Sequence, residues 1–227
     1  MSENHSRIVE VLLQGLPFTL AATLGGIALT IALSLAAGLA MLSRSKLARA
    51  VSRTYVEIFR GTSEVVQLFW FFYALPVLIG FQLVPLFAGI VVLGLNHGAY
   101  GAEIVRGAVR SVPKAQVEGA IALNLSPAQR MRRVLLPQAL VEMVPPFNNL
   151  FIQLLKGSAL LSFIQVQEIV QRGQSLVPVF GPDIGFIYAV ELVLYLVLAL
   201  MITLVMRVLE RTSARRVGRT PMKVRAA

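Results

Sequence analysis

The sequence has no cysteine, only 2 histidines and few charged residues, and each of these shortages excludes a class of chemistry. Without cysteine the chain forms no disulfide, no thiolate metal site and no cysteine nucleophile. Charged residues make up 14% of the 227 residues and hydrophobic residues 56%, well above the roughly 45–50% of soluble domains. The histidines and scattered carboxylates form no cluster of catalytic groups. The composition indicates an integral membrane protein with no catalytic or metal-binding residues.

Long apolar segments define the expected architecture. The first residues, 1–14, are polar and lack the basic segment and cleavage site of a secretory signal peptide, so none is expected. A spanning helix needs about 20 mostly apolar residues, and apolar segments recur as far as Met206. We therefore expect one all-α transmembrane domain over 1–227, with five spans at about 16–42, 63–79, 85–105, 138–164 and 184–206.

The placement of basic residues predicts the orientation of these spans. Lys and Arg together number 21, against 11 Asp and Glu. Apart from Arg7, Lys156 and Arg172, they lie in 43–62, 106–133 and a basic tail, 207–227. Cytoplasmic loops of membrane proteins carry an excess of Lys and Arg, so we expect the N-terminus outside and the C-terminus in the cytoplasm. Topology thus accounts for the basic charge, and no nucleic-acid partner is expected.

The expected cytoplasmic loop, 106–137, is about thirty residues long, a length that usually indicates function in a compact protein. Ser111 is placed to cap a helix with Pro113 in its first turn, and Asn124 to end it, because Asn tolerates left-handed backbone. Ser126, followed by a proline, is placed to begin a second helix. The periodicity alone fits either a helix that docks on a partner or a helix that lies on the membrane surface.

This loop resembles the EAA loop of binding-protein-dependent ABC importer permeases, which reads Glu-Ala-Ala, three residues, Gly, nine residues, Ile, one residue, Leu-Pro. The matching positions are Glu118, Gly119, Ala120, Asn124, Val134, Leu136 and Pro137. Here Gly119 replaces Ala, Asn124 replaces Gly and Val134 replaces Ile. The resemblance extends over about 15–208 and is closest to the polar amino acid permease branch.

Further motifs match that branch and also depart from it. The run 55–62 followed by Gln67 is similar to the branch pattern, but Ser63-Glu64 replaces the usual Pro-Leu. Leu154-Leu-Lys156 matches, whereas Gly157-Ser-Ala-Leu160 replaces Asp-Thr-Ser-Leu. The segments most similar to permeases for the compatible solutes ectoine and hydroxyectoine are 121–126, 130–133 and 136–140.

The resemblance implies a type I ABC importer permease in the bacterial inner membrane. Two permease subunits, homologous or identical, would form the pathway within the lipid. An ABC ATPase dimer would bind ATP and Mg, and an extracytoplasmic binding protein would deliver a polar amino acid or compatible solute, with ectoine or hydroxyectoine as the best match. The chain itself lacks the Gly-x-x-x-x-Gly-Lys-Ser/Thr phosphate loop, so it is expected to be neither an enzyme nor a cofactor-binding protein. The residues implied in coupling to the ATPase are Glu118, Gly119, Ala120, Asn124, Ser126 and Pro137.

Polar side chains within the apolar segments are candidates for the translocation pathway, because polar groups in hydrocarbon are costly and tend to face the protein interior. Glu64 and Gln67 share a helix face, and Glu64 either lines the pathway or pairs with Arg60 near the cytoplasmic end. Asn96 and Tyr100 either bind a zwitterion or bridge neighbouring helices.

The fourth apolar segment contains two adjacent prolines and several amides, as expected of a broken helix beside a water-filled cavity. Its pathway candidates are Asn148 and Gln153. Lys156 either attracts a solute carboxylate or extends to the outer interface. The sequence assigns no role to His97 or Glu191.

A secondary transporter is the remaining alternative function. Such folds commonly contain structural repeats over a larger number of spans. Five apolar segments without an evident repeat argue against it.

Overall fold

The computed structural model describes residues 2–216, and all the regular structure in this range is helical. The α-helices are α1 (Ser2–Leu13), α2 (Leu16–Ala40), α3 (Lys46–Gly61), α4 (Glu64–Phe69), α5 (Leu75–Ile79), α6 (Pro85–Ser111), α7 (Lys114–Ala122), α8 (Pro127–Arg130), α9 (Leu136–Gly157), α10 (Ile169–Leu176) and α11 (Ile184–Arg216). Two π-helical segments are η1 (Trp70–Ala74) and η2 (Met131–Leu135), and two 3₁₀ segments are η3 (Ser158–Ile164) and η4 (Gly181–Asp183). Of the basic tail predicted at 207–227, the part after Arg216 lies outside the described residues.

Three helical stretches in the described chain are long and apolar enough to cross a membrane: Asn4–Ala40, Pro127–Ile164 and Gly181–Ala214. The bent pair formed by α3 with the helix Glu64–Ile79 makes a fourth if it counts as one span. Helix α6 is 27 residues long and packs against α2 and α9. The chain is thus a multi-pass helical bundle, and the count of five spans and their orientation stay predictions.

The segment predicted as the second span, about 63–79, follows a sharp bend of 104° after α3 and contains η1. Each π-helical segment ends just before a proline, Pro76 after η1 and Pro137 after η2. Proline has no backbone N–H and its ring clashes with the carbonyl one turn earlier, and a wider π turn relieves both problems. The π segments therefore have a local cause, the proline that follows each of them, which hydropathy does not record.

Small residues allow α2 and α6 to pack closely. A Cβ on Gly94 would lie 2.5 Å from the Leu29 side chain, and a Cβ on Gly101 would overlap the Ser34 hydroxyl. That hydroxyl donates a hydrogen bond to the Gly98 carbonyl at 3.3 Å. Small residues and hydroxyls of this kind replace the hydrophobic effect as the basis of helix association in lipid.

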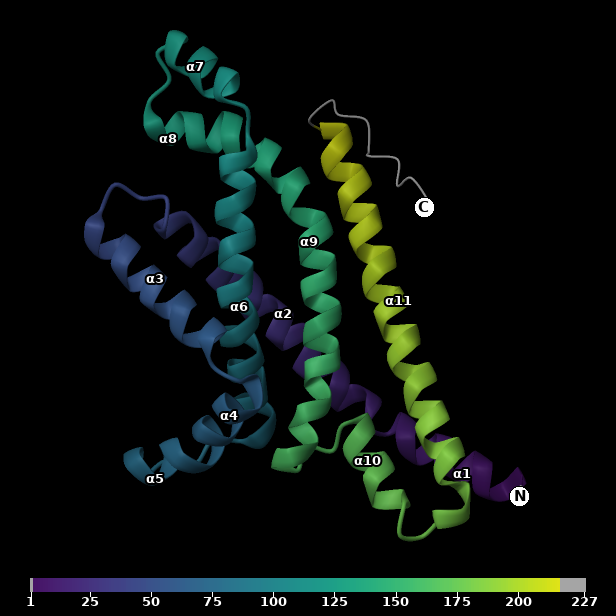
Figure 1. Cartoon of the computed structure of the whole chain (residues 1–227). Helices are drawn as coiled ribbons and strands as arrows, with labels where there is room; N and C mark the ends of the chain where they lie inside the picture. Colours follow the sequence, from purple (N-terminus) through teal and green to yellow (C-terminus); the bar gives the residue numbers. More distant parts are fainter. Residues whose placement is uncertain (1, 217–227) are drawn as a thin grey trace.

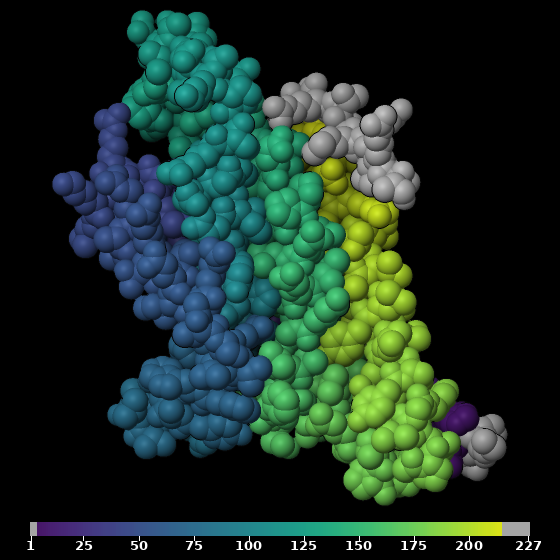
Figure 2. Space-filling view, viewed as in Figure 1, coloured from purple at the N-terminus to yellow at the C-terminus, as the bar shows by residue number. Residues whose placement is uncertain are grey.

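The two ends of the bundle carry different elements (Figure 1). Helices α6, α9 and α11 lie side by side around a core that includes Phe147, Phe151 and Met206. The α7–α8 segment projects at one end, and α4–α5 projects at the other, as the space-filling view shows (Figure 2). Helices α1 and α10 lie at the α4–α5 end, where Ile8 and Ile187 share a core cluster.

Helix α10 is held by a buried carboxylate. Glu168 caps the helix by accepting hydrogen bonds from the Val170 and Gln171 amides at 3.0 and 2.8 Å, and the Tyr195 hydroxyl donates to it at 3.0 Å. Burial raises the pKa of Glu168 above the ordinary value of 4.5, although these hydrogen bonds act to lower it. The Glu191 carboxylate of α11 fills the space where a side chain on Gly173 would lie.

Candidate functional site

The loop 106–137 folds as α7, a sharp corner and α8. The Asn124 amide donates to the Ile121 carbonyl at 2.8 Å, and the Leu125 amide donates to the Ala120 carbonyl at 3.1 Å. These two bonds form a Schellman motif, which requires a left-handed residue after the helix. Asn124 has a φ of 53°, so it adopts the conformation that the sequence predicted.

The second helix of the loop begins at Ser126 with a complete capping box: Ser126 Oγ accepts from the Gln129 amide at 3.3 Å, and Gln129 Oε1 accepts from the Ser126 amide at 2.9 Å. The cap expected from Ser111 is wrong. Its hydroxyl donates to the Ala108 carbonyl at 2.8 Å inside α6, and Pro113 holds the N-cap position of α7. Helix α6 runs beyond its predicted end near 105, and so it includes Ser111.

Helix α7 offers a surface for a partner. Glu118 and Gly119 are exposed, whereas Ala120 is buried. Two large apolar side chains on this projecting segment, Ile121 and Leu123, are 51% and 76% exposed. Uncovered apolar side chains beside polar ones are typical of an interaction surface.

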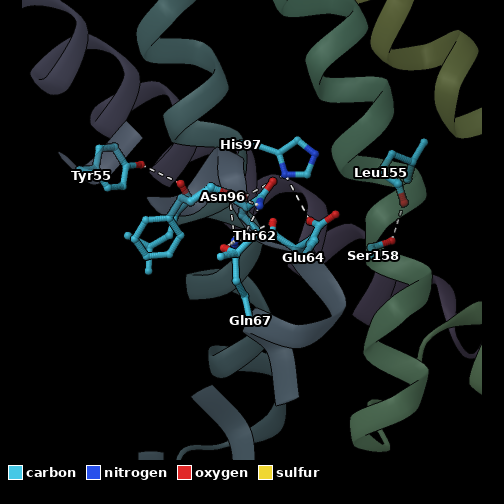
Figure 3. A network of polar contacts seen from close by, with 11 residues as sticks. Tyr55, Thr62, Glu64, Gln67, Asn96, His97, Leu155 and Ser158 are labelled. Carbon is cyan, nitrogen blue, oxygen red and sulfur yellow. Dashed lines mark hydrogen bonds and ion pairs between the residues drawn. The ribbon is translucent and has the colours of Figure 1, made fainter. Parts of the chain in front are cut away.

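The turn between α3 and α4, which we call the elbow (residues 59–67), is held by two amide side chains (Figure 3). Gln67 Nε2 donates to the Phe59 carbonyl at 2.9 Å and to Thr62 Oγ1 at 2.7 Å. Asn96 Nδ2 on α6 donates to the Phe59 carbonyl at 3.0 Å and to Gln67 Oε1 at 3.1 Å. Asn96 therefore bridges α6 to the elbow, which is one of the two roles that the sequence left open.

Glu64, the first residue of α4, points toward His97 of α6 (Figure 3). Glu64 Oε1 lies 3.4 Å from His97 Nδ1, which in turn lies 3.1 Å from the Leu93 carbonyl oxygen. An ion pair between Glu64 and Arg60, the alternative drawn from the sequence, is not found among the described residues. The Arg60 guanidinium instead lies over the Tyr100 ring, 5.1 Å from its centroid. Glu64 therefore lies beside the middle of α6, away from the α7 end.

Three adjoining cavities lie along α6. The Glu64 cavity, of about 480 Å³, is lined by α4, α6 and α9 through Thr62, Glu64, Asn96, His97, Tyr100, Gln153 and Lys156, among others. The Asn149 cavity, of about 450 Å³, shares Tyr100 and Gln153 with it and adds Arg60, Glu103, Pro146 and Asn149. The Arg53 cavity, of about 480 Å³, shares Arg60 and Glu103 with the second and adds Arg53, Glu57 and Arg106. The shared residues make the three cavities one continuous series toward the end of α6 that leads into α7.

The candidates from the fourth apolar segment divide between two helix faces. Gln153 lines two of the cavities, but Asn148 lines none of the three, and Asn149 takes the place predicted for it. Asn149, Gln153 and Lys156 are spaced i, i+4 and i+7, which places them on one face of α9. Asn148 is turned about 100° away, and its Oδ1 is buried without a hydrogen-bond partner among the described residues. The i, i+4 spacing of Asn149 and Gln153 is a signal in the sequence that could have selected Asn149 together with Gln153.

The other predicted residues lie as follows. Glu64, Asn96 and Tyr100 line the Glu64 cavity, whereas Gln67 is buried within the elbow. The sequence assigned no role to His97, which lines the same cavity. Lys156 also faces this cavity, the setting in which it can meet a solute carboxylate.

Two departures from the branch pattern meet in the Glu64 cavity. A Cβ on Gly157 would lie 3.3 Å from Glu64 Oε1. The carboxylate supplied by α4 therefore lies in contact with the position from which an aspartate side chain at 157 would extend.

The residues that line the cavities are suited to binding a solute. Acidic and basic side chains line each of them, and among residues 2–216 no group of three or more His, Asp or Glu is placed to hold a metal ion. Cavities of a few hundred Å³ lined by charged and amide groups suit a small charged or zwitterionic molecule.

Comparison with known proteins places the chain among transport components. The sequence profile described as "Binding-protein-dependent transport system inner membrane component" matches residues 28–215. The probable amino-acid ABC transporter permease protein y4tF of Sinorhizobium fredii is 43% identical over 187 residues, covering 80% of this chain and 78% of that protein. The glutamine transport system permease protein GlnP of Escherichia coli K12 is 34% identical over 209 residues, covering 89% and 93%. The L-cystine transport system permease protein TcyB of Bacillus subtilis is 33% identical over 209 residues, covering 92% and 89%.

Solved structures give the same result for the fold. The chain matches the crystal structure of an amino acid ABC transporter with histidines at a TM-score of 0.83 and 28% identity, over 91% of this chain and 96% of that one. It matches an inward-facing structure of the MetNI methionine ABC transporter at a TM-score of 0.75 and 26% identity, over 89% and 96%. The similarity therefore covers nearly the whole of each chain.

Proposed function

The chain belongs to the family of binding-protein-dependent transport system inner membrane components and is an amino-acid ABC transporter permease, and we propose that it moves a polar, zwitterionic solute along the three cavities beside α6. Its relatives are permease subunits and not enzymes, and the ATPase is a separate subunit. The main support for this proposal is that the three cavities share lining residues and form one series from Glu64 to Arg53. Glu64, Asn96, Tyr100 and Gln153 are then pathway residues.

The solute is inferred from the charges. Glu64 on α4 and Lys156 on α9 face the same cavity, so a zwitterion can place its ammonium near the first and its carboxylate near the second. The amide of Gln153 adds a neutral donor and acceptor, and Asn96, whose Nδ2 donates to Phe59 and Gln67, holds the elbow that carries Glu64. This arrangement favours a polar amino acid or a compatible solute. Ectoine or hydroxyectoine is the narrower proposal, and its support is the sequence similarity of 121–126, 130–133 and 136–140.

Energy enters, in this proposal, through the α7–α8 corner. Helix α6 continues to Ser111 and α7 begins at Lys114, so a displacement of α7 moves the helix that lines all three cavities. Gln138 of α9 donates to Gln116 of α7 at 3.4 Å, which links the corner to the second lining helix. The coupling residues are Glu118, Gly119, Ala120, Asn124, Ser126 and Pro137.

The proposed assembly contains two permease subunits, homologous or identical, because one chain leaves the cavities open on one side. An ATPase dimer supplies the ATP and Mg sites, and an extracytoplasmic binding protein delivers the solute. The proposed location is the bacterial inner membrane, with α7 and α8 on the cytoplasmic side.

Uptake in proteoliposomes tests this function. The chain is reconstituted with its cognate ATPase and binding protein, and with the second permease where one exists, and radiolabelled L-amino acids, ectoine and hydroxyectoine are offered singly. We expect ATP-dependent accumulation of at least one of them and strong loss of uptake in Glu64→Gln. Accumulation driven by an ion gradient without ATP would contradict an importer of this class and favour a secondary transporter.

A further inference from the structure

Arg60 has an unusual position at the end of α3. Its guanidinium lies 5.1 Å from the centre of the Tyr100 ring, and both side chains are exposed to the cavities, Tyr100 to 40%. Arg60 lines the Arg53 and Asn149 cavities, and Tyr100 lines the Asn149 and Glu64 cavities. The pair therefore stands where all three cavities meet.

Neighbouring carboxylates do not neutralise Arg60. Glu103 lines the same two cavities, but its Oε2 accepts from Arg106 Nε at 2.8 Å on its own helix. Glu64 lies beside His97. Among the described residues no ion pair includes Arg60, so its positive charge faces the cavities. Arg60 also lies in the last turn of α3, where a positive charge is favoured by the helix dipole.

The stacking leaves the guanidinium ready to bind an anion. A guanidinium over an aromatic face is attracted by the ring quadrupole, an interaction that leaves its five N–H donors available for hydrogen bonds. That fork matches the two oxygens of a carboxylate. Tyr100 restricts the side chain, so less freedom is lost when a carboxylate binds.

We propose that Arg60, positioned by Tyr100, binds the carboxylate of the solute as it leaves the Glu64 cavity, and that the transported class is therefore restricted to molecules with a free carboxylate. This inference rests on the proposed function and adds a specificity-determining residue to it. In the Glu64 cavity the ammonium group lies near Glu64 and the carboxylate near Lys156. As the solute moves into the Asn149 cavity, its carboxylate passes from Lys156 to Arg60, which lines that cavity. Tyr100 acts as a positioning residue for Arg60.

Direct binding to the permease–ATPase complex tests this assignment without the selectivity of the binding protein. The complex is purified in detergent without the binding protein. Equilibrium dialysis then compares the L-amino acid identified by the uptake panel with its α-carboxamide, which lacks the negative charge. We expect the wild-type complex to prefer the acid by about tenfold or more, as hydrogen bonds to charged groups indicate. Arg60→Gln should reduce this preference severalfold, with Lys156 accounting for what remains, and Arg60→Lys should reduce it less.

Matched variants distinguish a loss of carboxylate binding from a loss of folding. Tyr100→Phe keeps the ring and should keep the preference, whereas Tyr100→Leu should weaken it. Lys46→Gln removes a charge from the first residue of α3 and should leave the preference unchanged. Equal affinity of the wild-type complex for acid and carboxamide, or an undiminished preference in a monodisperse Arg60→Gln complex, would overturn the proposal. Failure of every amino acid and compatible solute in the uptake panel would instead overturn the proposed function.

Discussion

The Glu64 carboxylate lies beside Gly157, with Oε1 3.3 Å from the position that a Cβ on Gly157 would occupy. Both residues depart from the pattern of polar amino acid permeases, which has leucine at the first position and aspartate at the second. The negative charge that the pattern places on α9 is supplied from α4 in this chain. Two carboxylates so close together would repel each other, so each departure makes the other tolerable.

Gly157→Asp alone is therefore expected to be harmful. It brings a second carboxylate against Glu64 and should destabilise the protein by about 1–3 kcal/mol, measured as a lower melting temperature in detergent. Adding Glu64→Leu leaves one carboxylate in the cavity and should recover both stability and solute uptake. A Gly157→Asp protein as stable and active as the wild type would contradict this account.

We expect His97 to affect solute uptake through its contact with Glu64. Its Nδ1 lies between Glu64 Oε1 and the Leu93 carbonyl oxygen, at 3.4 and 3.1 Å. His97→Asn can keep a nitrogen donor near the Nδ1 position and should retain most uptake, whereas His97→Leu removes it and should lower the uptake rate by about fivefold. Equal uptake by the two variants in proteoliposomes would show that the nitrogen donor at residue 97 does not contribute to transport.

Gly101 and Gly107 make a matched pair for the packing of α6. A Cβ on Gly101 overlaps Ser34 on α2, whereas a Cβ on Gly107 meets no atom within 4 Å. Gly101→Ala should destabilise the protein by about 1–3 kcal/mol through overpacking. Gly107→Ala should be neutral or stabilise it by up to about 1 kcal/mol, the difference in helix propensity. Thermal unfolding of both proteins in one detergent measures the contrast, and equal melting temperatures would refute it.

Local chemistry explains which features the sequence could predict. The left-handed Asn124 and the Ser126 cap depend on residues within one or two turns, and both adopt the expected conformation. The start of α6 at Pro85 likewise coincides with a residue suited to the first turn of a helix. The cap expected from Ser111 was wrong because α6 continues six residues beyond its predicted end near 105, where Ala108 and Val109 pack against Ala139 and Met143 of α9.

The residues of the cavities were harder to predict because their roles are set by distant segments. Pairing of Glu64 with Arg60, four residues away, was one of two interpretations, but after the bend at the end of α3 the Arg60 guanidinium lies over Tyr100 on α6. Asn148 was chosen over Asn149, although Asn149 shares a helix face with Gln153, because the sequence does not show which face of α9 lines a cavity. The sequence left two interpretations of Lys156 open, because it does not show that α4 and Glu64 line the same cavity as Lys156.

The corner at Asn124 should tolerate glycine and not valine. At a φ of 53°, a β-branched residue costs about 1–2 kcal/mol or more, whereas glycine adopts this backbone freely. Asn124→Gly should keep ATP hydrolysis that is stimulated by the solute-loaded binding protein, and Asn124→Val should lose most of it. Membrane insertion serves as the control, since neither change lies in an apolar span. Full stimulation of ATP hydrolysis in the valine variant would show that coupling does not depend on the conformation of this corner.

We expect α10 to be held less strongly to the rest of the protein as pH rises. Burial raises the pKa of Glu168 from 4.5, so the folded state holds the proton more tightly than the unfolded state. Its stabilising contribution is therefore complete below the ordinary pKa and is lost as pH rises through the raised one. Hydrogen exchange of the α10 amides, corrected for the intrinsic effect of pH, should show falling protection in the wild type and a flat profile in Glu168→Gln. Because the Glu191 carboxylate also lies against α10 at Gly173, Glu191→Gln is the matched control and should keep the wild-type trend. Protection that increases with pH would mean that the hydrogen bonds from Val170, Gln171 and Tyr195 stabilise the charged carboxylate more than burial penalises it.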